Sequence, residues 1–209
     1  MKVFWELTAI RFYVTGVVCF GLFYFTNSLI TLWLGSEYLL SDWILYLLLF
    51  NLFVMFTRGV VQMYIHSYGL YADTWSAWLE VIVNIVVTVI CASQWGILGI
   101  LLGKVVSSTI IALFWKPYYL YHSGFKLPVS CYWKGMLPHY FLFAMGIVLF
   151  YPIVHTHILP HIHDFIDLLL YGGGIIAIYA IAYIIILYIC TKGMKHFVYR
   201  IPIVNRMKN

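Results

Sequence analysis

Residues 75–115 read WSAWLEVIVNIVVTVICASQWGILGILLGKVVSSTIIALFW, and they are the clearest indication of the fold class. It holds two apolar runs, 75–93 and 96–115, which only Gln94 and Trp95 separate. Each run is close to the roughly 20 residues that a helix needs to cross a bilayer. Two such runs with so short a connection predict a tight hairpin of membrane-spanning helices.

The same pattern extends in both directions from this hairpin. Further long apolar stretches run over 14–34, 43–65, 136–154 and 168–190. Of the 209 residues, 64% are hydrophobic and only 9% are charged, whereas soluble domains are typically about 25% charged. We therefore expect an all-α protein, a polytopic transmembrane helical bundle with about six spanning helices in contact with membrane lipids.

The composition between the spans predicts how the chain is organised. Lysines mixed with aromatic residues follow the fourth span, which suits a segment in the headgroup layer. We expect a four-helix transmembrane part over 1–121, a cytoplasmic interfacial loop over 122–135, a final transmembrane pair over 136–191, and a basic cytoplasmic tail over 192–209.

The orientation follows from the basic residues near the span ends. They lie before the first span, between the fourth and fifth spans, and in the tail, at Lys2, Arg11, Lys116, Lys126, Lys134, Lys192, Lys195, Arg200, Arg206 and Lys208. The positive-inside rule places these segments in the cytoplasm, so both termini are expected there. Because the cations sit at segment ends rather than in one stripe, the net charge of +5 does not indicate nucleic-acid binding.

Three ionisable residues lie within the predicted spans: Arg58, Glu80 and Lys104. Charges inside a membrane are costly, so each one is a candidate functional residue. A pair between Arg58 and Glu80 is expected from the hairpin of the second and third spans. Two interpretations stay open: the pair only neutralises two charges, or a cation faces an aqueous cavity that receives an anionic substrate. Lys104 likewise either extends to the nearer membrane face or lines such a cavity and attracts a phosphate.

Small and amide residues in the hairpin predict close helix packing. Gly99 and Gly103, with Gly96 one turn earlier, form a small-residue pattern that lets a neighbouring helix approach closely. Asn84 is a mid-span amide, for which a hydrogen bond between helices is the default expectation. We group Glu80 and Asn84 as structural or coupling residues.

The sequence carries little sign of catalysis. It has no nucleophile elbow, phosphate loop, paired catalytic carboxylates or HExxH motif, so we expect no enzyme and no cofactor. The loop between the fifth and sixth spans holds four histidines, but they match no standard ligand spacing. We expect no metal site there, and these weak candidates are His155, His157, His161 and His163.

A series of short motifs between Asn27 and Phe125 resembles a known family. In chain order the motifs are Leu32-Trp33-Leu34-Gly35-Ser36-Glu37-Tyr38, Gly69-Leu70-Tyr71, Glu80 with Asn84, Gly96-Ile97-Leu98-Gly99 with Gly103, and Trp115-Lys116-Pro117-Tyr118 before Gly124-Phe125. Their order and spacing resemble the carboxy-terminal half of Wzx-type polysaccharide (O-antigen) flippases, which belong to the MOP exporter superfamily.

The resemblance implies a fold, a location and a function. It implies one lobe of a MATE/MOP-like transporter in the bacterial inner membrane, which moves undecaprenyl-diphosphate-linked oligosaccharide for O-antigen or capsule synthesis. Because family members have two lobes, we expect a carboxy-terminal fragment or half-transporter that needs an amino-terminal lobe or a second copy. Arg58 and Lys104 are the cations that could bind the diphosphate of this polyprenyl-linked substrate.

Other functions remain open alongside this resemblance. An inactive fragment or a non-transporting membrane scaffold would fit the missing lobe. An intramembrane lipid-modifying enzyme would need acidic or histidine residues clustered at one membrane depth. A cation-coupled drug antiporter would need a carboxylate near its substrate, and Glu80 is the candidate.

Overall fold

The fold is known from a computed structural model that describes residues 1–200. This part of the chain is helical and contains no β-strand. Six helical stretches are long and apolar enough to cross a membrane: Lys2–Trp33, Asp42–Ser67, Tyr71–Trp95, Ile97–Phe125, Ser130–His161 and Phe165–Cys190. The all-α bundle with six candidate spans is thus confirmed, and the chain is a multi-pass membrane protein. The predicted tail cations Arg206 and Lys208 lie outside the described residues.

The chain divides into two compact units. The first comprises Met1–Leu39 and the chain from Gly135 to the end of the described residues, and the second comprises Leu40–Lys134. This differs from the expected division into 1–121 and 136–191. The first span belongs to the same unit as the last two, because long-range aromatic packing joins them and local sequence does not reveal it.

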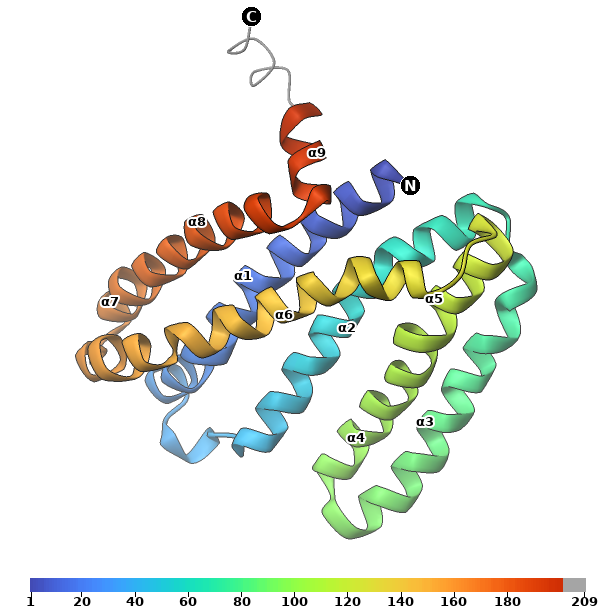
Figure 1. The fold of residues 1–209 in the computed structure, drawn as a ribbon. Coiled ribbons are helices and arrows are strands. Elements are labelled where there is room, and N and C mark those ends of the chain that lie inside the picture. Colours follow the sequence, from blue (N-terminus) through green and yellow to red (C-terminus); the bar gives the residue numbers. More distant parts are fainter. Residues whose placement is uncertain (201–209) are drawn as a thin grey trace, which may run out of the picture. The chain divides into compact units, whose positions relative to one another are not determined.

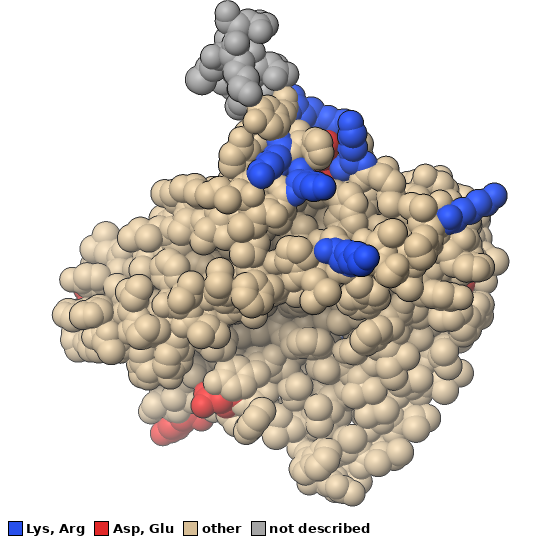
Figure 2. Space-filling model, in the orientation of Figure 1, with Lys and Arg blue, Asp and Glu red and all other residues tan. Residues whose placement is uncertain are grey.

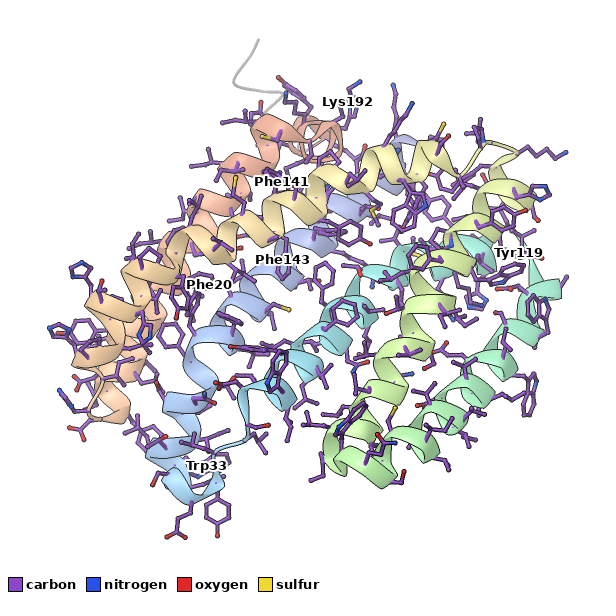
Figure 3. The ribbon with its side chains drawn as sticks, turned by 60° about the horizontal axis from the view of Figure 1, so that its bottom comes forward. Phe20, Trp33, Tyr119, Phe141, Phe143 and Lys192 are labelled. Carbon is purple, nitrogen blue, oxygen red and sulfur yellow. The ribbon has the colours of Figure 1, made fainter. Side chains whose placement is uncertain are left out.

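Helix α1 (Lys2–Trp33) packs against other helices of the first unit through aromatic rings. Phe20, labelled in Figure 3, stacks on Tyr179 of α8 with ring centroids 3.9 Å apart. The Tyr24 hydroxyl donates a hydrogen bond of 2.6 Å to the carbonyl oxygen of Ile147 in α6. The other helices of this unit are α6 (Ser130–Ile153), which begins in the second unit, α7 (Phe165–Asp167), α8 (Gly173–Cys190) and α9 (Lys192–Arg200).

The first helix begins well before the expected span over 14–34. It starts at Lys2, and Phe4, Ala9 and Phe12 are fully buried. Glu6 is also buried, and its Oε2 lies 3.0 Å from Nη1 of Arg200 in α9. The charges that end the apolar run in the sequence are therefore partly neutralised by tertiary pairing, and the helix continues through them.

The second unit contains the hairpin that the opening stretch predicts. Helix α2 (Asp42–Ser67) precedes α3 (Thr74–Trp95) and α4 (Ile97–Ser108). Figure 1 shows α3 and α4 side by side and antiparallel. Their connection is Gly96, whose φ of +55° favours glycine and allows the abrupt reversal.

The fourth span is longer than the expected 96–115. A π-helical turn at Thr109–Trp115 leads into α5 (Lys116–Tyr119) and a second π-helical turn at Leu120–Phe125. The segment 122–135, expected as an interfacial loop, is largely helical, and the connection to α6 covers only 126–129. Pro117 does not end the helix, because wide turns rearrange the backbone hydrogen bonds that proline would otherwise break.

The histidine-rich connection is also more helical than expected. After α6 the chain continues through a π-helical turn at Val154–Ile158 and a 3₁₀ turn at Leu159–His161. Helix α7 follows after only three residues, 162–164. The histidines therefore lie largely on the end of a spanning helix, because the apolar residues between them continue the helical packing.

The surface agrees with a bilayer environment. The face drawn in Figure 2 is almost entirely free of charged side chains, apart from small groups of basic and acidic residues. In the first unit, basic atoms gather around α9, the helix that carries Lys192, Lys195 and Arg200. The labelled Trp33 at the end of α1 is 72% exposed, as suits an aromatic ring at the membrane surface.

Candidate functional site

The candidate site depends on the close approach of α3 and α4. A Cβ atom on Gly99 would collide with the backbone of Cys91, and one on Gly103 would collide with the Thr88 hydroxyl. The predicted close packing at these two glycines is confirmed. Gly96 has a different role from the predicted one, because a Cβ atom there would meet no neighbour within 4 Å and the residue instead forms the turn.

Three helices of the second unit bring the candidate charges together. Oε1 of Glu80 in α3 lies 3.3 Å from Nη1 of Arg58 in α2 and 3.0 Å from Nζ of Lys104 in α4. The expected pair between Arg58 and Glu80 is present, and Lys104 joins the same carboxylate oxygen. Two cations share one anion, so the cluster carries a net charge of +1 when all three groups are ionised.

The cations have donors to spare. Arg58 and Lys104 each donate one hydrogen bond to Glu80, whereas a guanidinium has five N–H donors and an ammonium has three. The exposed fractions of the side chains are 29% for Arg58, 47% for Lys104 and 16% for Glu80. The carboxylate is therefore the covered member, and both cations remain accessible to a further anion.

A cavity of about 210 Å³ lies against these cations. Arg58 and Lys104 line it, together with Asn51 of α2 and Ser108 at the end of α4. Its remaining lining is apolar and comes from α2, at Leu48, Leu52, Val54 and Met55. A cavity with two cations, an amide and a hydroxyl on otherwise apolar walls suits a small anionic group.

The cluster lies deep within its spans. Arg58 precedes the end of α2 at Ser67 by about two and a half turns, or roughly 14 Å. Lys104 follows the start of α4 at Ile97 by about two turns, or roughly 10 Å. The hydrocarbon core of a bilayer is about 30 Å thick, so both cations lie within it rather than at its surface.

Asn84 lies in the helix contact and not in this cluster. Its Oδ1 accepts a hydrogen bond of 3.3 Å from the Thr88 hydroxyl on the same helix. The residue also lies close to Gly103, where a Cβ atom would come within 2.9 Å of the Asn84 carbonyl oxygen. Asn84 therefore shapes the contact between α3 and α4, which favours the structural role over the coupling role.

A second polar cluster in this unit was not predicted from the sequence. The carboxylate of Asp73, a residue that is 2% exposed, accepts hydrogen bonds of 2.6 Å from Nζ of Lys116 and from Nε1 of Trp115. The only sequence signal was an aspartate just before a helix, a common capping position. Its partners lie more than 40 residues further along the chain, so only the folded hairpin reveals them.

The four candidate histidines do not form a ligand set. Within residues 1–200, no group of three or more His, Cys, Asp or Glu side chains could hold a metal ion. Asp164 and Asp167, which follow the histidines, instead form a capping box at the start of α7.

Comparison with protein-family profiles, curated proteins and solved structures finds no match for this chain. The Arg58–Glu80–Lys104 cluster and its cavity are therefore the features of the chain that bear on function.

Proposed function

We propose that the chain belongs to a membrane transporter in which Arg58 and Lys104 bind the phosphate groups of a lipid-linked oligosaccharide. The observation that carries the proposal is the net positive cluster, at membrane depth, beside a cavity of about 210 Å³. A cluster that served only to neutralise charge would need one cation for each carboxylate. The second cation is an excess that a substrate anion would balance.

The chemistry of the two cations suits a diphosphate. A guanidinium can bind two phosphate oxygens with parallel hydrogen bonds, and an ammonium adds a compact charge. The cavity is large enough for an anionic group but not for an oligosaccharide or a lipid chain, which would extend beyond it. We propose the polyprenyl-diphosphate-linked oligosaccharide as the substrate class, which is also what the motif series implies.

Glu80 has a defined part in this proposal. Without substrate, its carboxylate holds both cations in place and offsets part of the cost of burying them. When a diphosphate arrives, the spare donors of Arg58 and Lys104 bind it, and Glu80 keeps their positions. Because the carboxylate is already engaged by two cations, the structure favours this role over that of the coupling carboxylate in a drug antiporter.

Genetic complementation tests the proposal. The chain is expressed in a strain that lacks its polysaccharide flippase, alone and with the amino-terminal lobe of a flippase, and surface polysaccharide is measured. We expect restoration in at least one arrangement, and loss of restoration in Arg58→Ala and Lys104→Ala. The matched control is Lys195→Ala, which removes an exposed lysine from α9.

Membrane insertion is measured for every variant, so that loss of transport is separated from loss of protein. Normal transport by both Arg58→Ala and Lys104→Ala would refute the substrate site. Failure of the unmodified chain in both arrangements, with the protein present in the membrane, would favour a non-transporting scaffold.

A further inference from the structure

A second and larger cavity lies in the same unit, and the proposed substrate site does not use it. Its volume is about 440 Å³. Five aromatic residues form much of its wall: Trp75, Phe114, Trp115, Tyr118 and Trp133. We call it the aromatic groove. The rest of the wall is aliphatic and includes Leu79, Ile110 and Val129.

The rings of the aromatic groove are held in place before any ligand binds. Nε1 of Trp115 donates to Asp73, and Trp75 meets the Trp115 ring edge to face with centroids 4.9 Å apart. Phe114 packs against Trp133 with centroids 5.4 Å apart. Since Lys116 occupies the other carboxylate oxygen of Asp73, this nearby charge is already neutralised. The groove therefore suits a hydrocarbon rather than a sugar or a cation.

Several residues of the groove wall lie near the ends of their helices. Trp75 lies one residue after the start of α3, and Trp133 lies in the first turn of α6. Tyr118 lies in α5, near the end of the fourth span. Tryptophan and tyrosine are enriched at this level of a bilayer, where acyl chains join their headgroups.

Two lysines close to these residues in the chain provide a complementary charge. Lys126 and Lys134 flank the groove residues Val129 and Trp133 in the chain, and both are exposed. Unlike Lys116, neither forms an ion pair within the described part of the chain. Exposed ammonium groups that lie close in the chain to the wall of an apolar groove suit a phosphate attached to a hydrocarbon chain.

We propose that the aromatic groove binds one acyl chain of an anionic phospholipid from the surrounding bilayer, with its phosphate held by Lys126 and Lys134. The proposal is independent of the transport function, because it shares no residue with the Arg58–Glu80–Lys104 cluster. A bound lipid would fill the space between the start of α6 and the α3–α4 hairpin and would hold the fixed rings of the groove together.

Native mass spectrometry of the purified full chain tests this. The probes are phosphatidylglycerol and phosphatidylcholine with identical acyl chains, added in turn to protein in detergent. We expect the unmodified chain to retain phosphatidylglycerol in preference to phosphatidylcholine. The double substitution Lys126→Gln and Lys134→Gln should remove that preference, because each lysine raises the affinity for the anionic lipid by roughly fivefold.

A pair of tryptophan substitutions tests the groove itself. Ile110→Trp places a bulky ring in the groove wall and should reduce retention of both lipids to background. Ile85→Trp makes the same change at a position on α3 that is 56% exposed and does not line the groove, and should leave retention unchanged. Size-exclusion chromatography and circular dichroism confirm that each variant is folded.

Equal retention in Ile110→Trp and the unmodified chain would overturn the proposal. So would equal binding of the two lipids by the unmodified chain, because the lysines would then have no part in binding. Either result would leave the transport proposal untouched, since that one depends on complementation through Arg58 and Lys104.

Discussion

Glu80→Gln separates the two roles that the cluster combines, stability and anion binding. The substitution keeps the size and shape of the side chain and removes its negative charge. Arg58 and Lys104 then face a neutral amide in place of the carboxylate oxygen that lies 3.3 Å and 3.0 Å from their nitrogens. We expect a less stable protein that binds a diphosphate more tightly.

The magnitude of the stability loss follows from exposure. Removing one partner from a buried ion pair costs about 3–5 kcal/mol, whereas an exposed pair contributes about 0–1 kcal/mol. Glu80 is 16% exposed, but its partners are 29% and 47% exposed, so the cluster lies between these limits. We expect Glu80→Gln to lower the free energy of unfolding by about 1–3 kcal/mol.

The gain in anion affinity follows from the charge of the cluster. Removing the carboxylate raises the net charge from +1 to +2. Two unit charges about 5 Å apart attract by about 3 kcal/mol at an effective dielectric constant of about 20. The accessible side of the cluster weakens this, so we expect affinity to rise on the order of tenfold.

The assay uses the purified chain in lipid nanodiscs with farnesyl diphosphate, a short isoprenyl diphosphate, as the probe. Thermal unfolding and probe binding are measured on the same preparations. The control is Glu6→Gln in the first unit, which removes a buried carboxylate whose Oε2 lies 3.0 Å from Nη1 of Arg200 in the same unit. It should lower stability without changing the affinity for the probe.

Weaker or unchanged probe binding by Glu80→Gln would refute the reasoning. In that case the positioning of Arg58 and Lys104 by Glu80, and not the net charge of the cluster, would decide the affinity for the anion. A gain of the same size in Glu6→Gln would also refute it, because the effect would then reflect overall charge and not the cluster.

Further substitutions test the packing and hydrogen bonding of the two units, each by thermal unfolding in detergent. Gly103→Leu should separate α3 from α4, because even a Cβ atom would collide with the neighbouring helix, and overpacking of this kind costs about 1–3 kcal/mol. Asp73→Asn should cost about 3 kcal/mol, because it leaves the Lys116 charge largely buried and unpaired. Tyr179→Phe should be neutral or slightly stabilising, because that buried hydroxyl has no hydrogen-bond partner within residues 1–200. Tyr24→Phe should instead cost about 1 kcal/mol, because it removes the bond to the Ile147 carbonyl.

Particular outcomes would contradict these expectations. An unchanged melting temperature in Gly103→Leu would mean that the hairpin tolerates separation. A small effect of Asp73→Asn would mean that Lys116 finds water or lipid phosphate instead. Equal losses in the two tyrosine variants would mean that ring packing, and not the hydroxyl bond, decides their contributions.

Much of the site was predictable from local sequence. Because charges are costly in a hydrocarbon environment, Arg58, Glu80 and Lys104 can be recognised as candidate functional residues from their positions within apolar runs. The short connection between the third and fourth spans also predicts that α3 and α4 are neighbours. The sequence did not predict that Lys104 and Arg58 share one carboxylate oxygen. Spans that are apolar on all sides do not show which face of the helix is turned toward its neighbours.

The ends of the spans were predicted less well. From hydropathy, the first span was expected to begin after Glu6 and Arg11, and the fourth span to end before Lys116 and Pro117. In the folded chain α1 continues through the first pair of charges, and the fourth span continues through Lys116 and Pro117. Arg200 pairs with Glu6, Asp73 pairs with Lys116, and π-helical turns accommodate the proline. A hydropathy window cannot register such partners, because they come from distant parts of the chain.

By itself the sequence determined the class of protein, the number of candidate spans and the α3–α4 hairpin. These depend on the length of apolar runs and on the size of residues such as Gly99, which are local properties. Only the tertiary structure decided that α1 belongs with α6 and α8, that Asp73 anchors Lys116, and that fixed aromatic rings enclose a groove. The physical reason is that transfer into the bilayer stabilises every apolar helix to a similar degree, whereas side-chain shape and charge pairing select which helices pack together.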